Sequence, residues 1–260
     1  MESLYYEVVC VSTDTNDVGF KRFIDTAYKY NLNIKILGLD CNWEGGDMNN
    51  GIGGGQKVNL LKEYLNNEGE KELEKIIIFT DSYDVIFECG IDEIHEKIKS
   101  LLNKYNKHID NVIIFSSEKT CWPNKNYQSC FENTTYGYNY LNSGGIICKA
   151  SNLKKLLENI KNNEDDQEYY TKLFLNLKKT NSDITPLLDS NCLIFQTLNN
   201  SYKEILFNKC QRRLININTN TKPCIIHANG PKYIKDILNN YYDNTINKIF
   251  YKNKISIMYC

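Results

Sequence analysis

The chain has 260 residues, of which 42% are hydrophobic and 12% aromatic, and its formal net charge is −1. This composition is typical of a folded globular protein, and the small net charge argues against a dominant electrostatic contact with nucleic acid or an anionic membrane. The ten cysteines never form a C-x-x-C pair, which excludes the usual zinc-ribbon and thioredoxin signatures.

The start of the chain and its apolar runs predict the compartment. Residues 1–5 contain neither a basic region nor a long apolar run, so we expect no signal peptide. No apolar run approaches the ~20 residues that a membrane span needs. We therefore expect a cytoplasmic protein with no membrane span and no nucleic-acid partner; the sequence leaves its oligomeric state and cysteine pairing open.

Strand and helix patterns alternate along the chain. An apolar run at 6–12, helical spacing over 17–30 and a second strand at 33–39 predict a right-handed βαβ unit. The further expected strands are 76–79, 112–116, 140–148 and 223–227, and the further expected helices are 57–65, 91–105, 153–160, one that follows the acids at 164–167, and 232–242. Short strands near 187–189, 195–196, 205–207 and 214–217 are expected to form a smaller mixed sheet.

This alternation predicts an α/β fold with a Rossmann-like, mostly parallel sheet that is flanked by helices. We expect one domain over residues 1–242 and a C-terminal tail over 243–260, to which the sequence assigns no role.

The stretch 76–87 carries the first chemical signal. Its apolar residues run directly into Asp81 and Asp84, and three more apolar residues follow. A continuous apolar run is typical of a strand buried on both faces, and open α/β sheets bind ligands at the carboxyl ends of such strands. The alternative is that the two acids cap a helix or lie in a solvated turn.

The segment 40–55 contains six glycines, which let a backbone approach another group closely. It resembles a Walker A loop but departs from it at Gln56 and Val58. A helix that begins at Lys57 would present free N–H groups and a lysine to this loop, which suits an anion. The alternative is a mobile glycine loop.

Further segments of the chain also carry candidate functional residues. The long aromatic connection 121–140 has the length of a lid or binding loop. His227 ends an apolar run and precedes a Gly-Pro turn. The acids Glu164, Asp165 and Asp166 precede a helical pattern, where capping is their usual role. Asp81, Asp84 and His227 together offer mixed oxygen and nitrogen ligands, which suit manganese better than zinc or calcium.

A metal beside a glycine-rich loop indicates a diphosphate, either of a nucleotide to be hydrolysed or of an activated sugar. The spacing of Asp81 and Asp84 is one residue too long for a haloacid-type phosphohydrolase, and Val85 follows where Gly-Thr would stand. Tyr83, between the acids, offers a flat face on which a base could stack.

Eight short motifs occur in one order along residues 6–242. They are Trp43-Glu-Gly-Gly-Asp47, Gly53-Gly-Gly-Gln-Lys57, Phe79-Thr-Asp-Ser-Tyr-Asp-Val-Ile-Phe87, Cys121-Trp-Pro123, Leu141-Asn-Ser-Gly-Gly145, Asp165-Asp-Gln-x-Tyr-Tyr170, Ile194-Phe-Gln196 and His227-x-Asn-Gly-Pro231. In this order the chain resembles the glycosyltransferase domain of the procollagen lysyl hydroxylases and the related stand-alone viral collagen glycosyltransferases. The resemblance implies a GT-A fold and a UDP-sugar donor used with manganese. For a viral member, the expected compartment is the cytoplasm of the host cell or of a viral factory.

The resemblance also implies roles for individual residues. The metal ligands are Asp81, Asp84 and His227. The expected nucleotide and donor contacts are Val11, Ser12, Thr13, Met48, Lys57, Asp81, Ser82, Tyr83, Gly230, Pro231 and Lys232, with the last three at the diphosphate. Trp43, Trp122 and Asn229 are expected near the acceptor and sugar, and Asp165 and Asp166 near the reacting sugar, where Asp166 would face the positive charge that develops there.

The predicted reaction is manganese-dependent, retaining transfer of glucose from UDP-glucose to the 2-hydroxyl of galactosyl-hydroxylysine in collagen. One alternative keeps the fold but moves galactose from UDP-galactose to hydroxylysine, or uses a non-collagen acceptor. Others are a non-catalytic relative that binds a sugar nucleotide or glycan, and a manganese-dependent nucleotide hydrolase. The sequence leaves open whether Asp166 acts as a covalent nucleophile or the acceptor attacks on the face that the phosphate leaves.

Overall fold

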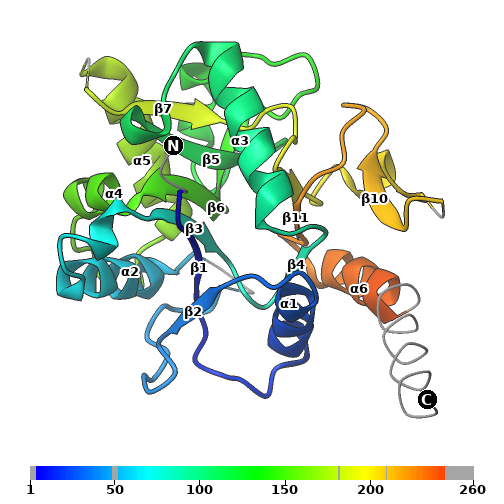
Figure 1. Cartoon of the computed structure of the whole chain (residues 1–260), viewed down its shortest axis with the longest axis horizontal. Helices are drawn as coiled ribbons and strands as arrows, with labels where there is room; N and C mark the ends of the chain where they lie inside the picture. The colour runs from blue at the N-terminus through cyan, green and yellow to red at the C-terminus, as the bar shows by residue number, and fades with distance from the viewer. Residues whose placement is uncertain (1–3, 49–51, 181, 209, 244–260) are drawn as a thin grey trace.

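A computed structural model describes residues 4–48, 52–180, 182–208 and 210–243, and its centre is a six-stranded sheet (Figure 1). The strand order is β2-β1-β3-β6-β5-β7. The strands are β1 (Tyr6–Val11), β2 (Ile34–Leu37), β3 (Ile76–Thr80), β5 (Val112–Glu118), β6 (Tyr140–Lys149) and β7 (Thr185–Leu188). Only β6 runs antiparallel to its neighbours in this sheet, so the sheet is mostly parallel, as predicted.

Helices cover both faces of the sheet (Figure 1). The helices α1 (Val18–Lys29) and α3 (Ile91–Tyr105) pack on one face, and α2 (Gly55–Asn67), α4 (Ala150–Leu156) and α5 (Asp166–Lys179) pack on the other. Strand β3 shows why two layers are needed, because Ile76 and Ile78 join the core under α1 and α3 while Ile77 and Phe79 join the opposite core. Alternate side chains of a strand point to opposite faces, so a continuous apolar run is buried only between two layers.

A second, smaller sheet has the strand order β4-β11-β8. Its strands are β4 (Val85–Phe87), β8 (Phe195–Thr197) and β11 (Ile225–His227), and β11 runs antiparallel to β4 but parallel to β8. A separate hairpin, β9 (Ile205–Asn208) and β10 (Arg213–Asn216), and helix α6 (Lys232–Tyr241) complete the described chain. The apolar stretch 76–87 is therefore two strands in two sheets, and residues 81–84 form the junction between them.

The predicted α/β class, with a mostly parallel sheet and a smaller mixed one, is confirmed. The predicted grouping of the short strands is wrong, since β7 joins the edge of the main sheet and β9 pairs only with β10. Leu187 and Leu188 pack against opposite cores, as a strand between two helical layers requires. Helix α4 also begins three residues earlier than predicted, directly at the end of β6, and ends where Leu157 turns extended.

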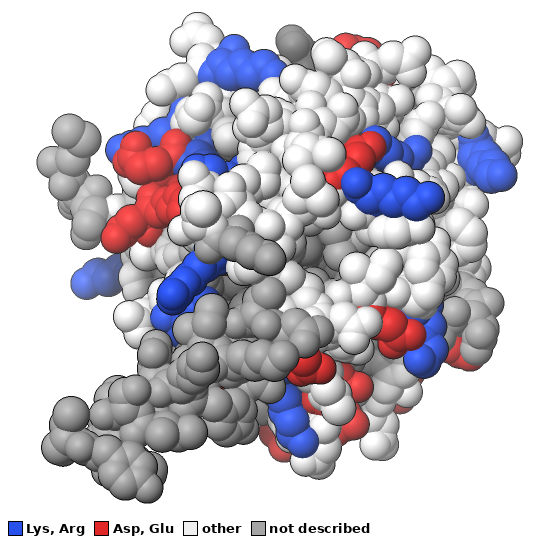
Figure 2. All heavy atoms as spheres, turned by 90° about the vertical axis from the view of Figure 1, so that its right-hand side faces the viewer, with Lys and Arg blue, Asp and Glu red and all other residues white. Residues whose placement is uncertain are grey.

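The predicted domain boundary at residue 242 follows the end of α6, and the predicted tail lies outside the described residues except for Asp243. Among the described residues, no helix combines the length and apolar character that crossing a membrane requires. The face that carries β10 and α6 shows basic and acidic side chains interspersed among uncharged ones, with no continuous basic patch (Figure 2).

Candidate active site

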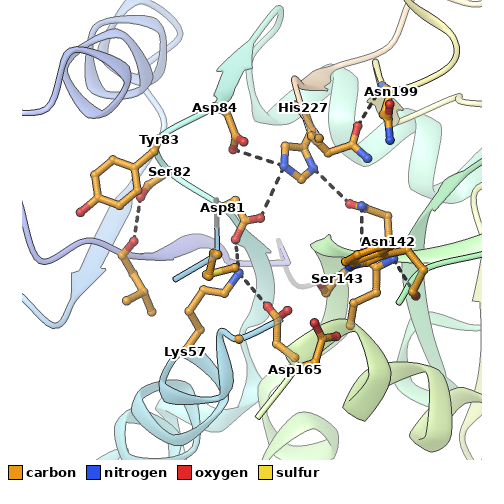
Figure 3. A pocket seen from close by; sticks show the side chains of 18 of the residues that line it. Lys57, Asp81, Ser82, Tyr83, Asp84, Asn142, Ser143, Asp165, Asn199 and His227 are labelled. Atoms are coloured by element: carbon orange, nitrogen blue, oxygen red, sulfur yellow. Dashed lines mark hydrogen bonds and ion pairs between the residues drawn. The ribbon is translucent and has the colours of Figure 1, made fainter. Parts of the chain in front are cut away.

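A cavity of about 900 Å³ opens where the two sheets meet (Figure 3). Its walls come from the carboxyl end of β1, the junction between β3 and β4, the middle of β6, the starts of α2 and α5, and the segment after β11. Of the eighteen residues that the sequence assigned to a site, all but Lys232 line it. Segments more than 200 residues apart in the chain therefore meet at one site.

Asp81, Asp84 and His227 converge on one point, as Figure 3 shows. One ligand atom from each lies within 4.8 Å of the other two. The Nε2 atom of His227 is 3.2 Å from Asp84 Oδ1 and 3.4 Å from Asp81 Oδ2. The other ring nitrogen, Nδ1, lies 3.0 Å from Asn142 Oδ1, a contact that leaves Nε2 directed at the two acids.

The electrostatics of these three residues fit a cation. Burial alone would raise the pKa of Asp84, but the charge of His227 and its hydrogen bond hold that pKa well below its usual range. Burial would lower the pKa of His227, and the charge of Asp84 outweighs this and raises it. Two carboxylates and one imidazole nitrogen thus face the point that a divalent cation would occupy. The oxygen and nitrogen donors suit manganese.

Gly144, on β6, leaves the space in which the three ligands meet. A Cβ atom at this position would lie 2.2 Å from His227 Cε1 and 2.8 Å from Asp81 Oδ2. Both distances are too short for non-bonded atoms, so only glycine fits without displacing two ligands. Residues 142–145 lie within β6, in the strand predicted at 140–148, and Gly144 is the residue that leaves room for Asp81 and His227.

Lys57 is buried and joins two acids from different elements. Its Nζ atom lies 2.6 Å from Asp81 Oδ1 and 2.6 Å from Asp166 Oδ2. Burial would lower the pKa of Lys57, but the charges of Asp166 and Asp81 outweigh it and raise that pKa. Asp166 therefore faces Asp81 across a single ammonium, on the side of the cavity away from His227.

The glycine loop packs against the start of α5. Gly54 has φ +98°, and a Cβ atom there would lie 2.8 Å from Asp166 Cγ. The predicted anion site on free N–H groups of α2 is wrong, because the N–H groups of Gly54, Gly55 and Gln56 already donate to backbone carbonyls. The glycines bring the loop to the acidic segment, and Lys57 is the part of it that reaches the cavity.

The acids ahead of α5 divide between two roles. Asp165 is the N-cap of α5, and its Oδ1 accepts a hydrogen bond of 2.7 Å from the N–H of Glu168. The capping alternative thus holds for Asp165, whereas Asp166, the first residue of the helix, turns its carboxylate to Lys57. Burial raises the pKa of Asp166, and Lys57 opposes that rise.

The predicted nucleotide residues of β1 and the junction also meet. The hydroxyl of Tyr83 accepts hydrogen bonds from Ser12 Oγ and from the backbone N–H groups of Thr13 and Asp14, at 3.0–3.1 Å. Ser82 Oγ donates to the carbonyl of Val11 at 2.7 Å. These bonds tie the loop after β1 to the residues between Asp81 and Asp84.

Lys232, at the start of α6, does not line the cavity as the sequence predicted. The side chain of Lys232 is 88% exposed and pairs with Asp236. Lys235, less than one turn further, lines the cavity with its Nζ atom 3.4 Å from Asp84 Oδ2. Residues three apart share one face of a helix, so this periodicity is the signal that could have selected Lys235.

A buried polar network was missed by the sequence reading. The carboxylate of Glu118 accepts hydrogen bonds from Gln167 Nε2 at 2.7 Å, Asn142 Nδ2 at 3.0 Å and Asn229 Nδ2 at 3.1 Å. Burial raises the pKa of Glu118, and these amide donors oppose the rise. The network links Gln167, the neighbour of Asp166, to Asn142, the amide that orients His227. Glu118 thus positions residues on both sides of the cavity.

Replacing Glu118 by Gln is expected to weaken manganese affinity about 10- to 100-fold, the usual effect of losing a group that orients a metal ligand. The new amide would present N–H donors to side chains that already donate, so Asn142 would lose its orientation toward His227. Titration of the protein with manganese measures the effect. Glu132→Gln, on the exposed surface, is the matched control and should leave affinity unchanged.

Comparisons with known proteins identify the family of the chain. Residues 3–255 match the family model described as "PLOD GT domain". Procollagen-lysine,2-oxoglutarate 5-dioxygenase 2 of Mus musculus is 37% identical over 92% of this chain, and the multifunctional procollagen lysine hydroxylase and glycosyltransferase of Caenorhabditis elegans is 32% identical over 92%. The chain spans 31% and 32% of the length of these two relatives.

Solved structures are more distant. A glycosyltransferase involved in glycosylation of the major capsid of PBCV-1 is 8% identical, with a TM-score of 0.43, and the match covers 89% of this chain and 97% of that one.

Proposed function

The chain belongs to the family of PLOD GT domains, and from this premise we propose that it is a manganese-dependent, retaining glucosyltransferase. It would move glucose from UDP-glucose to galactosyl-hydroxylysine of collagen. The observation that carries the proposal is the pair of buried charge clusters in one cavity: Asp81, Asp84 and His227 on one side, and Asp166 held by Lys57 on the other. The first suits a metal-bound diphosphate, and the second places an acid beside the reacting sugar.

The residues that would hold the metal are Asp81, Asp84 and His227, and manganese bound there would offset the negative charge of the departing diphosphate. Lys235 supports the diphosphate in place of Lys232, because only Lys235 lines the cavity. Tyr83 and the loop after β1 hold the nucleoside.

Asp166 acts at the sugar. The bond between the anomeric carbon and the diphosphate breaks as the bond to the acceptor oxygen forms, and positive charge develops on that carbon. The proton of the acceptor hydroxyl passes to the departing diphosphate. The carboxylate of Asp166, whose Oδ2 lies 2.6 Å from Lys57 Nζ, would stabilise this charge and orient the reacting groups. Trp43, Trp122 and Asn229 line the part of the cavity assigned to the sugar and acceptor.

Asp166→Asn is expected to lower turnover about 100-fold or more, because the amide keeps the size of the side chain but carries no charge to stabilise the sugar. UDP release with saturating donor and acceptor measures this. Asp165→Asn is the matched comparison: asparagine caps a helix as well as aspartate, so turnover should fall much less. Equal losses in the two variants would contradict the role of Asp166.

The experiment that tests the function is a screen of donor and acceptor with manganese present. UDP-glucose with a galactosyl-hydroxylysine collagen peptide should release UDP fastest and yield the glucosylated peptide. Faster turnover of UDP-galactose with a hydroxylysine peptide would favour the galactosyltransferase alternative. UDP release that no peptide accelerates would indicate a nucleotide hydrolase, and tight UDP binding without turnover would indicate a binding protein.

A further inference from the structure

A second cluster of metal-binding side chains lies outside the cavity. Cys89 follows β4, Glu93 lies in the first turn of α3, and Cys224 immediately precedes β11. Two sulfur atoms and a carboxylate oxygen from these residues all lie within 4.8 Å of one another. Both cysteines are buried, at 5% and 0% exposure, whereas Glu93 is partly open to solvent. The cluster therefore has a closed sulfur side and an accessible oxygen side.

We propose that Cys89, Glu93 and Cys224 bind a thiophilic divalent cation of the zinc type. Zinc accepts thiolate and carboxylate ligands in a tetrahedral shell, and water can supply the fourth ligand on the open side. Manganese prefers oxygen and nitrogen, so the sulfur-rich cluster and the cavity would select different metals. Nothing in the proposed transferase reaction uses this second site.

The charges around the cluster favour the replacement of the two thiol protons by a divalent cation. Glu93 pairs with Arg213 Nη1 at 2.6 Å and with Lys97 Nζ at 2.8 Å. When both thiols lose their protons to a bound dication, two negative charges and two positive charges appear together. The net local charge therefore stays the same, and the two basic side chains remain compensated.

Two observations bear on the ionisation of the thiols. The hydrogen bond with Cys224 and burial raise the pKa of Cys89. Burial would raise the pKa of Cys224, but the hydrogen bond from Cys89 and the charge of Lys97 outweigh it and lower that pKa, so Cys224 is the first of the two to become a thiolate. The Nε atom of Arg213, whose charge also acts on both cysteines, is buried and has no hydrogen-bond partner in the described part of the chain. A thiolate sulfur is an acceptor that such a donor lacks. Ordinary core packing explains the burial of both cysteines, but not their convergence with a carboxylate.

A cation here would hold three elements that support the active site. Cys224 directly precedes the strand that His227 ends, and Cys89 stands five residues after Asp84. The two strands are joined beside the cluster by a hydrogen bond of 2.8 Å from Glu88 N–H to the carbonyl of Cys224. The zinc-type site would therefore fix β4 against β11 and the start of α3.

Cobalt(II) titration of the whole metal-stripped chain tests the proposal, with excess manganese present to occupy Asp81, Asp84 and His227. One equivalent of cobalt should give intense thiolate-to-cobalt charge-transfer bands, which zinc should then remove. Zinc at 100 times its Kd should also raise the Tm by about 5 °C. Cys89→Ala and Cys224→Ala should abolish the bands, whereas Cys148→Ala, a buried cysteine outside the cluster, should keep them.

Glu93→Gln keeps the folded core intact should the cysteine variants fold poorly. It should weaken zinc affinity at least about tenfold, whereas Glu96→Gln, exposed on the same helix, should leave it unchanged. The proposal is overturned if the folded chain gives no thiolate bands, or if bands persist in both cysteine variants through the exposed Cys41, Cys130 or Cys210. Unchanged zinc affinity in Glu93→Gln would show that Glu93 is not a ligand, which contradicts the proposed site.

Discussion

Asp84→Asn is expected to lower sugar transfer at least about 1,000-fold, the largest effect of any single change at the site. The side chain is 12% exposed, with one oxygen 3.2 Å from His227 Nε2 and the other 3.4 Å from Lys235 Nζ. Asparagine keeps the shape but removes the charge that binds the cation and that raises the pKa of His227. Manganese binding and turnover should therefore be lost together.

The matched control is Asp236→Asn, since Asp236 pairs only with the exposed Lys232 among the contacts described for it. Its turnover should equal that of the unmodified protein. Turnover measured across a range of manganese concentrations separates weak binding from a loss of chemistry. If Asp84→Asn kept full activity at ordinary manganese concentrations, the assignment of this residue as a metal ligand would be wrong.

Gly144→Ala should be nearly as damaging, although it adds only a methyl group and no charge. The added carbon would lie 2.2 Å from His227 Cε1, 2.5 Å from His227 Nδ1 and 2.8 Å from Asp81 Oδ2. His227 must move to accommodate it, and the hydrogen bond of its Nδ1 to Asn142 is then lost. We expect manganese affinity and turnover to fall about 100-fold or more, because a ligand and its orienting partner are displaced together.

Gly69→Ala is the control for this change, since a Cβ there meets only the carboxyl end of the Glu72 side chain, which can turn away. Calorimetric manganese titration and a melting curve should accompany the assay. A folded Gly144→Ala protein with normal manganese affinity would show that the three ligands do not form one site.

Much of the main sheet was readable from the sequence because its strands are continuous apolar runs. Residues 76–80 are fully buried between two helical layers, and this demands the unbroken apolar pattern that the sequence shows. Helix α1 was equally clear, since Asp17 caps it and Phe20, Phe23 and Ala27 recur on its buried face. The short strands β7 to β10 were harder, because a run of three or four residues defines a strand but not its partner.

The site was readable where the chemistry lies in neighbouring residues and less so where it depends on tertiary contact. Asp81 and Asp84 could be predicted from the sequence because they follow a buried strand. Glu118 gave no local signal, because its importance comes from Asn142, Gln167 and Asn229, which reach it from three other segments. The anion site expected at the start of α2 failed for the same reason: carbonyls distant in sequence already accept its N–H groups.

The junction at residues 81–84 has a mechanical consequence. Asp81 directly follows β3 of the main sheet, Asp84 directly precedes β4 of the smaller sheet, and His227 ends β11 of the smaller sheet. A cation held by all three would therefore add a cross-link between two sheets that have separate backbone ladders. By thermodynamic linkage, metal affinity and the rigidity of this hinge must rise and fall together. Amide hydrogen exchange in β4 and β11 should consequently slow when manganese binds. A metal bound by these three residues would therefore also fix the angle between the two sheets.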